Sequence, residues 1–346
     1  MKNYRVFLLI LMIFSGIQSL SAQGVSKSKS PAYQYYFDSL KTMDYPYTFP
    51  IWGAKAYKKG YDLPYAWGAS LIYFTQKQQI LIDQTLIGLN GSEKVDLSEF
   101  INFGPTIATT NAVTFRPDLW ILPFLNVYGI LGGGNTSTEV VLLEPISLET
   151  TQKFAVSSFG LGATLTGAVG PLFVIWDNNY NFADVEVVVE PVPAFNSSIR
   201  VGHNFMDPLK PDRTLAVWAG VFYQNIRNDT RGSIAINQIF PDAGSGATVD
   251  NLRDWADDLP PAKRVVVNQI IDEIEEFADG KNIGESEIDY ELQKRVAAPF
   301  NLIVGAQYQL NKRWMLRTEL GVFGKRSQFL LNLNYRFPGF KNYSKK

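Results

Sequence analysis

The chain has 346 residues, a formal net charge of −1 and no cysteine, and 14% of its residues are aromatic. The missing cysteine excludes disulfides, thiolate-bound metals and the lipidated cysteine of a bacterial lipoprotein. The balanced charge gives no electrostatic reason to expect nucleic acid as a partner. A chain of this length accommodates one large β domain.

The N-terminal residues have the pattern of a secretory signal peptide. Lys2 and Arg5 precede an apolar run over residues 6–14, and small residues follow. We predict a cleavage that removes residues 1–22 and leaves Gln23 first in the mature chain. The apolar run is shorter than the about 20 residues that a membrane-spanning helix needs. An exported chain without such a helix can cross a membrane only as a closed barrel.

Residues 23–63 form the next predicted segment, which begins with lysine and serine and then becomes rich in tyrosine. They precede the first strand-like pattern. Two interpretations remain open for them, a periplasmic arm and a segment threaded into the interior of the β domain.

Residues 64–337 are predicted to be strand-rich. Eleven strands are expected near 65–75, 79–88, 102–114, 119–131, 154–167, 171–178, 195–205, 213–225, 299–309, 313–323 and 327–337. Short turns are expected at the ends of several, including 76–78 and 116–117, and long loops elsewhere, including 132–153. Because single-chain bacterial barrels have even strand counts, we expect about 12 strands, within a range of about 10–14. The twelfth is sought in 47–58 or 232–240.

Residues 226–298 interrupt the strand pattern and are predicted to be one long loop. Within them, residues 262–279 carry apolar side chains at helical spacing, with Pro261 before the run and Gly280 after it. Proline at the start and glycine after the end are helix boundary signals. The predicted helix could serve as a lid, a plug or a surface that binds a partner.

The three C-terminal segments alternate between apolar and polar residues, with Met315 and Leu330 as apolar exceptions on the polar face. A side-chain period of two is that of a β-strand. Trp314, Tyr335 and Phe337 end the apolar face. A soluble sandwich and a membrane barrel both fit this alternation, but strands of about ten residues and alternating short and long connections favour the barrel.

The ending Tyr335-Arg336-Phe337 resembles the aromatic ending of outer-membrane β-barrel proteins, although here a tail, residues 338–346, follows it. The resemblance covers roughly residues 65–337. It implies an all-β antiparallel transmembrane barrel in the outer membrane, in contact with outer-membrane lipid, and it implies that Tyr335 and Phe337 are the signal for the barrel-assembly machinery. The sequence Leu20-Ser21-Ala22-Gln23 is similar to the signal ends of Bacteroidota exports. No narrower family is indicated.

Charged residues on the predicted inner face are the candidate functional residues. They are Arg200, Arg313, Arg317, Glu319 and Arg336. A structural ladder of paired charges and a cationic constriction that selects anionic solutes both explain them.

Catalytic and metal sites are not expected. The single histidine, His203, falls on the lipid-facing side of its strand, where a catalytic triad cannot form. No cofactor site and no metal site is predicted. The favoured function is a porin-like or small-solute channel with a helical lid or plug. A structural or surface-interaction barrel with a filled lumen is the alternative, and an outer-membrane hydrolase is the third hypothesis.

Overall fold

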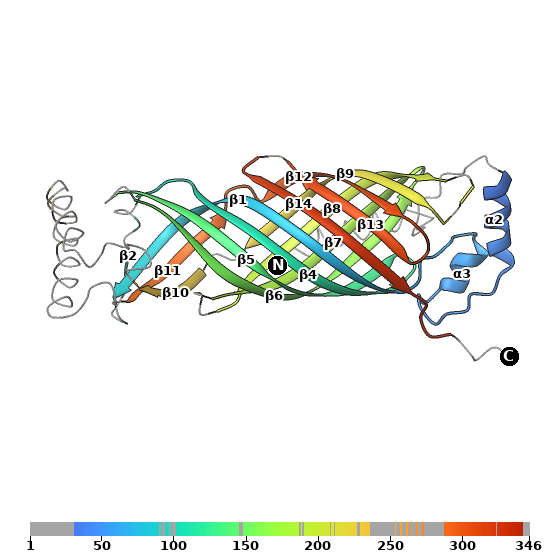
Figure 1. The fold of residues 1–346 in the computed structure, drawn as a ribbon, viewed down its shortest axis with the longest axis horizontal. Coiled ribbons are helices and arrows are strands. Elements are labelled where there is room, and N and C mark those ends of the chain that lie inside the picture. The colour runs from blue at the N-terminus through green and yellow to red at the C-terminus, as the bar shows by residue number, and fades with distance from the viewer. Residues whose placement is uncertain are drawn as a thin grey trace, which may run out of the picture.

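Ten antiparallel strands close into a barrel, and four more described strands of the same sheet lie outside this ring. The computed structural model describes residues 31–341, with gaps at 90, 92–93, 97, 99–101, 145–147, 187, 189, 208, 211, 227–228, 323 and, except for six single positions, 236–286. The barrel runs along the long axis in Figure 1. Among these described residues, no helix is long and apolar enough to cross a membrane.

The ring consists of neighbouring strands that follow one another mostly in chain order. Its members are β1 (Trp67–Leu89), β4 (Thr106–Leu122), β5 (Leu125–Glu144), β6 (Leu148–Val169), β7 (Leu172–Val185), β8 (Val192–Met206), β9 (Thr214–Ile226), β12 (Phe300–Gln309), β13 (Trp314–Gly321) and β14 (Arg326–Phe337). The ring closes because β1 pairs with β4 on one side and with β14 on the other. Two short strands, β2 (Val95–Asp96) and β3 (Asn102–Phe103), pair with β1 and β5.

Two predicted turns are wrong because the strands run straight through them. Strand β1 is continuous over residues 76–78, where Gln76 and Gln78 point inward and are buried while Lys77 is exposed. A lumen-facing glutamine and a turn residue look alike in sequence. Residues 116–117 lie inside β4, where Pro117 interrupts the pairing with β5 but not the pairing with β1. The turn after β4 lies at residues 123–124 instead.

The predicted long loop 132–153 is also mostly strand. Strands β5 and β6 contain 20 and 22 residues and are joined through residues 145–147. The prediction assumed strands of about ten residues, enough to cross the bilayer. These strands continue well beyond that length, which is why the expected loop is absent from this part of the described chain.

The predicted loop 226–298 contains two of the strands outside the ring, β10 (Asp229–Ala235) and β11 (Glu287–Val296). The two strands pair with each other, and they extend the paired strands β9 and β12 toward the barrel end opposite α2 and α3 (Figure 1). Strand β11 also replaces β14 as the neighbour of β1 from Ile80 onward. Residues 47–58 contain no twelfth strand. The predicted helix 262–279 lies outside the described residues, apart from isolated positions.

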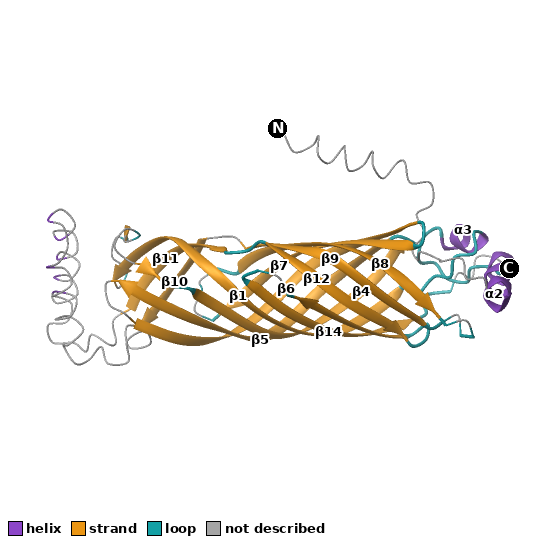
Figure 2. Ribbon diagram, turned by 90° about the horizontal axis from the view of Figure 1, so that it is seen from above, coloured by secondary structure: helices purple, strands orange, loops and turns teal. Residues whose placement is uncertain are grey.

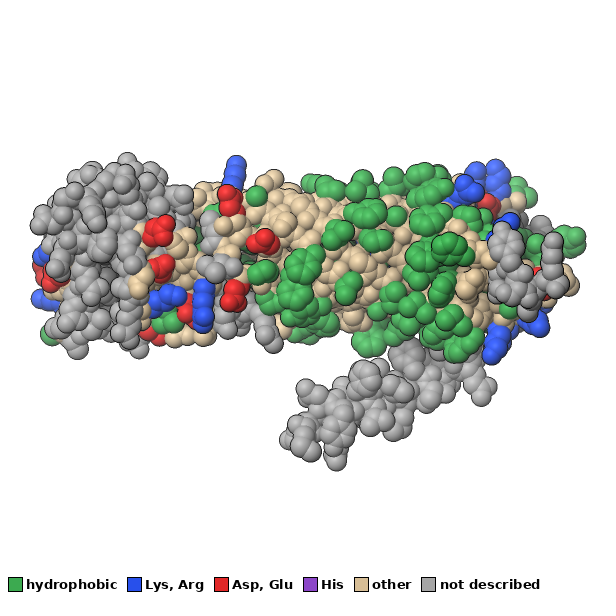
Figure 3. All heavy atoms as spheres, turned by 90° about the horizontal axis from the view of Figure 1, so that it is seen from below, with side chains coloured by type: hydrophobic (Ala, Val, Ile, Leu, Met, Phe, Trp, Pro, Cys, Tyr) green, Lys and Arg blue, Asp and Glu red, His purple; other side chains and the backbone are tan. Residues whose placement is uncertain are grey.

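Side chains alternate between an apolar exterior and a polar interior along the ring strands. Leu71, Phe115, Leu161, Ile199, Val304 and Leu316 are among many large apolar side chains that are exposed on the outside. Hydrophobic side chains form a broad band on the face shown in Figure 3, and charged side chains lie on both sides of this band. An apolar exterior around a polar interior is the arrangement of a membrane barrel and excludes a soluble sandwich, whose apolar face is buried.

Residues 31–66 fold at the end of the barrel that carries the short turns, and they do not thread through it (Figure 2). Helices α2 (Pro31–Thr42) and α3 (Gly53–Lys58) pack around the buried side chains of Leu40, Tyr57 and Leu63. The amide of Ile51 donates to the carbonyl of Ile121 at 2.8 Å, which ties this arm to β4. Burial raises the pKa of Tyr57 from 10.0 to about 12. The arm is therefore a small apolar unit attached to the barrel end.

Candidate functional site: the barrel interior

The interior of the barrel, here called the lumen, is lined largely by buried polar side chains. They include Ser70, Gln76, Asp118, Asn126, Thr164, Asn196, Ser198, Arg200, Gln224, Glu319, Arg326, Gln328, Asn332, Asn334 and Arg336. Buried polar groups are costly unless they find hydrogen-bond partners. Several of these groups find partners on strands that are not their neighbours in the sheet, so polar contacts cross the lumen.

The first cluster centres on Glu319 of β13. Arg200 of β8 donates from Nε and Nη2 to the two carboxylate oxygens of Glu319 at 2.6 and 3.0 Å. Trp218 of β9 donates from Nε1 to the same carboxylate at 2.9 Å. The side chains of Arg200 and Glu319 are only 11% and 4% exposed. This bidentate ion pair spans the lumen, because β9 and β12 separate β8 from β13 in the ring.

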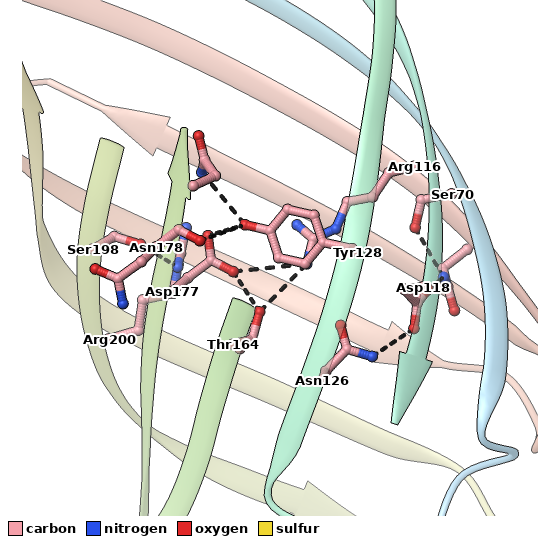
Figure 4. A network of polar contacts seen from close by, with 12 residues as sticks. Ser70, Arg116, Asp118, Asn126, Tyr128, Thr164, Asp177, Asn178, Ser198 and Arg200 are labelled. Carbon is pink, nitrogen blue, oxygen red and sulfur yellow. Dashed lines mark hydrogen bonds and ion pairs between the residues drawn. The ribbon is translucent and has the colours of Figure 1, made fainter. Parts of the chain in front are cut away.

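The second cluster centres on Asp177 of β7 and is shown in Figure 4. Its carboxylate accepts hydrogen bonds from the Tyr128 hydroxyl at 2.9 Å and from the Thr164 hydroxyl at 2.5 Å. The guanidinium of Arg116 lies 3.6 Å from the same carboxylate and 3.3 Å above the centre of the Tyr128 ring. Strands β4 and β7 are thereby linked across two intervening strands.

The third cluster centres on Asp118 of β4. Arg336 and Asn126 each donate to Oδ1 of Asp118 at 2.7 Å, and Asn334 approaches Oδ2 at 3.4 Å. Arg336 also donates to the carbonyls of Tyr65 and Ala66, so the end of the arm is held by the same side chain.

Amide side chains form a further layer across the lumen. Gln76 of β1 donates to Gln224 of β9 at 3.4 Å, and Gln224 donates to Asn196 at 3.1 Å. Asn196 in turn donates to Asn179 at 2.9 Å. Because β1 and β9 lie on opposite parts of the ring, this chain of neutral hydrogen bonds crosses the lumen.

Two luminal arginines have no carboxylate partner in the described part of the chain. Arg317 donates from Nε and Nη2 to the amide oxygen of Gln307 at 3.0 and 2.6 Å. Arg326, which is 2% exposed, donates from Nε to Gln78 at 3.2 Å, and its two Nη atoms have no hydrogen-bond partner in the structure. A buried charge without a partner of opposite sign is unfavourable, and in the described part of the chain no ion pair offsets that cost for either guanidinium group.

The structure separates the predicted luminal charges into three situations. Arg200 and Glu319 form one ion pair, and Arg336 pairs with Asp118 instead of with a predicted partner. Arg317 stands without a carboxylate. Arg313 is exposed at the turn between β12 and β13, where its Nη1 lies 3.4 Å from the Tyr335 hydroxyl.

Sequence reasoning missed several luminal residues. Arg116 and Asp118 were overlooked because a turn was placed at 116–117. Asp177 shares its inward face with Phe173 and Ile175, so alternation gave no polar signal there. Arg326 could have been found by extending the inward series of Gln328 by two residues.

Residues on the outer face lie where the alternation places them. Tyr335 packs against Trp314 with ring centres 4.7 Å apart, and Phe337 is 39% exposed at the end of β14. Their role as an assembly signal stays a prediction. His203 contacts the ring of Phe205, and its Nδ1 lies 3.0 Å from the carbonyl oxygen of Pro171. The described residues contain no group of three or more acidic or histidine side chains that could hold a metal ion.

Comparisons with known proteins give likenesses of fold. No protein-family model matches the chain, and no curated protein matches it. Similar solved structures include the β domain of the Bordetella autotransporter BrkA (9% identity, TM-score 0.38, 79% of this chain and 100% of that chain). An outer membrane channel from Pseudomonas putida F1 (12%, 0.32, 79% and 96%) and the outer membrane protein OprG from Pseudomonas aeruginosa (9%, 0.34, 80% and 98%) are also similar.

The architecture of the chain itself decides its class, because a closed antiparallel ring with an apolar exterior and a polar lumen is the only sheet that lipid tolerates. The chain has the architecture of a transmembrane β-barrel. Within this barrel, the lumen contains both buried charged side chains and a cavity, and it is the candidate functional site.

Proposed function

We propose that this outer-membrane barrel is a narrow channel for small solutes that is closed in the conformation described here. The observation that carries the proposal is a cavity of about 180 Å³ inside the barrel, reaching to the short-turn end. A barrel whose lumen served only as a structural core would be filled with paired side chains. This lumen keeps both open space and uncompensated charge.

The position of the two free arginines supports a preference for anions. Arg326 lies six residues from Asn332 along β14, and Asn332 pairs with Arg317 on β13. At about 3.3 Å per residue, the two cations are staggered by roughly 20 Å along the strand direction. Rings and rows of basic side chains select anions in pores. A solute that passed the lumen would meet Arg317 and Arg326 in turn.

Closure is attributed to the amide layer, because hydrogen bonds between neutral amides are each worth only about 1 kcal/mol and can be exchanged for bonds to solute or water. The ion pair of Arg200 and Glu319 is more costly to separate and acts as a fixed support. The predicted helix 262–279 would add a lid at the opposite end and belongs to this proposal. Export through the signal peptide 1–22 and contact with the barrel-assembly machinery belong to it as well.

The test is current across a planar bilayer that contains the refolded mature chain from Gln23. We expect rare, discrete openings, and a reversal potential in a salt gradient that favours chloride over potassium. The substitution Gln224→Ala removes the hydrogen bonds of that side chain to Gln76 and Asn196. It is expected to raise the open probability several-fold. Gln293→Ala, on the exposed face of β11, is the matched control and leaves the currents unchanged. Arg326→Gln reduces the preference for chloride.

A structural or surface-interaction barrel with a filled lumen is the second candidate, and the cross-lumen contacts of Glu319, Asp177 and Asp118 favour it. Silence of a folded, heat-modifiable barrel, both unmodified and as Gln224→Ala, would exclude the channel and leave this candidate. The hydrolase hypothesis stays the weakest, because His203 lies on the outer face.

A further inference from the structure

The luminal cavity has an apolar wall, which the polar character of the rest of the lumen does not lead one to expect. Phe173, Ala216 and Trp218 are buried together inside the barrel, with Ile175 packed against them. All four line the cavity. An apolar patch that faces water costs free energy, and this cost is removed when an apolar group covers the patch.

The chain accommodates these two aromatic rings by placing a glycine opposite each. Phe173 pairs with Gly202 across β7 and β8, and Trp218 pairs with Gly305 across β9 and β12. A Cβ at Gly202 would lie 2.4 Å from the Phe173 ring, and one at Gly305 would lie 2.6 Å from the Trp218 ring. Only glycine therefore lets both rings lie close against the barrel wall and leaves the space in front of them open.

The charge of the cavity wall is positive. Six basic and two acidic side chains line the cavity: Arg116, Arg200, Lys312, Arg313, Arg317 and Arg336, and Asp118 and Asp177. Asp118 and Asp177 pair with Arg336 and Arg116, Arg200 pairs with Glu319, and Lys312 pairs with Asp62 of the arm. Arg313 is exposed at the rim. Arg317 is thus the guanidinium inside the cavity that makes no direct ion pair with a described carboxylate.

Arg317 and the apolar patch adjoin each other. The Cζ atom of Arg317 lies 5.5 Å from the centre of the Trp218 ring. Gln307 accepts two of the five N–H groups of this guanidinium, so the remaining three can bind an anion. A carboxylate fits such a group as a planar, charge-assisted acceptor.

The volume limits the size of the ligand. A dry protein cavity of about 150 Å³ accommodates benzene. The luminal cavity, at about 180 Å³, has room for one ring and one small charged group. An inorganic anion would satisfy Arg317 and leave the apolar patch uncovered, whereas a neutral ring would leave the charge unbalanced.

We propose that the cavity binds a small organic carboxylate with a single flat apolar group, its carboxylate on Arg317 and its flat face against Phe173 and Trp218. The role of the bound molecule rests on the proposed function, since it would be the solute that the channel transports. Binding itself is measurable without transport.

Isothermal titration of the refolded, detergent-solubilised barrel with four probes tests the inference. Benzoate carries both features, benzamide lacks the charge, acetate lacks the ring, and inorganic phosphate carries charge alone. We expect benzoate to bind at least tenfold more tightly than each of the others. Equal affinity for benzoate and benzamide would exclude the role of Arg317, and equal affinity for benzoate and acetate or phosphate would exclude the role of the apolar patch. Absence of binding by all four would overturn the proposal.

Two variants test the residue assignment independently. Arg317→Gln removes the charge. It is expected to weaken the binding of benzoate at least tenfold and to leave the affinity for benzamide unchanged. Gln307→Glu keeps a hydrogen-bond partner at the same position, so this variant should fold. Because the new carboxylate pairs with Arg317, the variant should also lose its affinity for benzoate. Arg295→Gln removes an arginine from the exposed face of β11 and serves as the matched control.

Failure of the channel and failure of the ligand assignment give different results. A barrel that conducts but does not distinguish benzoate from the other probes keeps the proposed function and loses the ligand class. A barrel that binds benzoate through Arg317 but never conducts keeps the cavity assignment and loses the channel.

Discussion

The arm and the barrel of this molecule bury opposite kinds of side chain. The arm encloses Leu40, Tyr57 and Leu63, as a small soluble domain does. The barrel turns its leucines and valines outward and buries ion pairs and amides. The difference reflects the solvent that each region faces, because an apolar exterior is favourable only where lipid replaces water. The same substitution should therefore have different consequences in the two regions.

The largest expected effect is in the barrel. Glu319→Ala leaves the buried guanidinium of Arg200 without its bidentate partner and also removes the acceptor of the Trp218 indole. Breaking one side of a buried pair costs about 3–5 kcal/mol. We expect a loss of that size in the free energy of unfolding measured with guanidinium in lipid vesicles. Glu319→Gln, which keeps the shape and one acceptor, is the control and should lose less; equal losses would show that charge is unimportant there.

The arm should respond to truncation of its apolar core. Leu40 is 2% exposed, and Leu40→Ala in such a core costs about 2–5 kcal/mol. Hydrogen exchange should show faster opening of residues 31–66, with the barrel strands unchanged. Leu331→Ala, on the lipid-facing side of β14, creates no cavity in a protein core and is the matched control. A barrel that unfolded together with the arm would contradict the separation of the two regions.

The C-terminal strands were the easiest part of the fold to predict. From β12 to β14 most inward residues are polar and most outward residues apolar, with Ile303, Met315 and Leu330 as inward exceptions, so alternation alone assigns the faces. It failed at Gln76–Gln78, because luminal glutamines beside an exposed lysine resemble a turn, and at Phe173 and Ile175, because an inward apolar pair hides the face of Asp177.

The contacts of the site could not be predicted in the same way. Which carboxylate meets which arginine depends on how the ring closes. Arg336 pairs with Asp118 across β1, and Arg200 pairs with Glu319 across β9 and β12. Neither pairing follows from spacing along one strand. The strand count and register that determine both are set by closure of the whole sheet.

A pH titration sharpens the comparison, because the arm has buried tyrosines. The pKa of Tyr57 is about 12 in the folded arm and 10.0 ordinarily, and burial is the main cause. Because the pKa of the Tyr57 hydroxyl is raised in the folded arm, burial of the neutral hydroxyl contributes fully to arm stability below pH 10.0. This contribution is lost as the pH rises toward about 12. We expect the arm to become sensitive to protease in this range while the barrel stays folded. Tyr57→Phe keeps the ring and should reduce the pH dependence of protease sensitivity. An unchanged pH profile would show that a group other than Tyr57 causes it.

The smallest effect is expected from an ion pair of nearly the same length on the outside of the barrel. Arg295 of β11 lies 2.7 Å from Asp83 of β1, against 2.6 Å for Arg200 and Glu319, but its partners are 53% and 44% exposed. Exposed pairs contribute about 0–1 kcal/mol, since water solvates both charges once they separate. Arg295→Gln should therefore change the free energy of unfolding by less than about 1 kcal/mol, and raising the salt concentration should remove even that difference. Breaking the exposed pair could instead cost as much free energy of unfolding as breaking the pair of Arg200 and Glu319. That result would show that distance, and not burial, determines how much an ion pair stabilises this barrel.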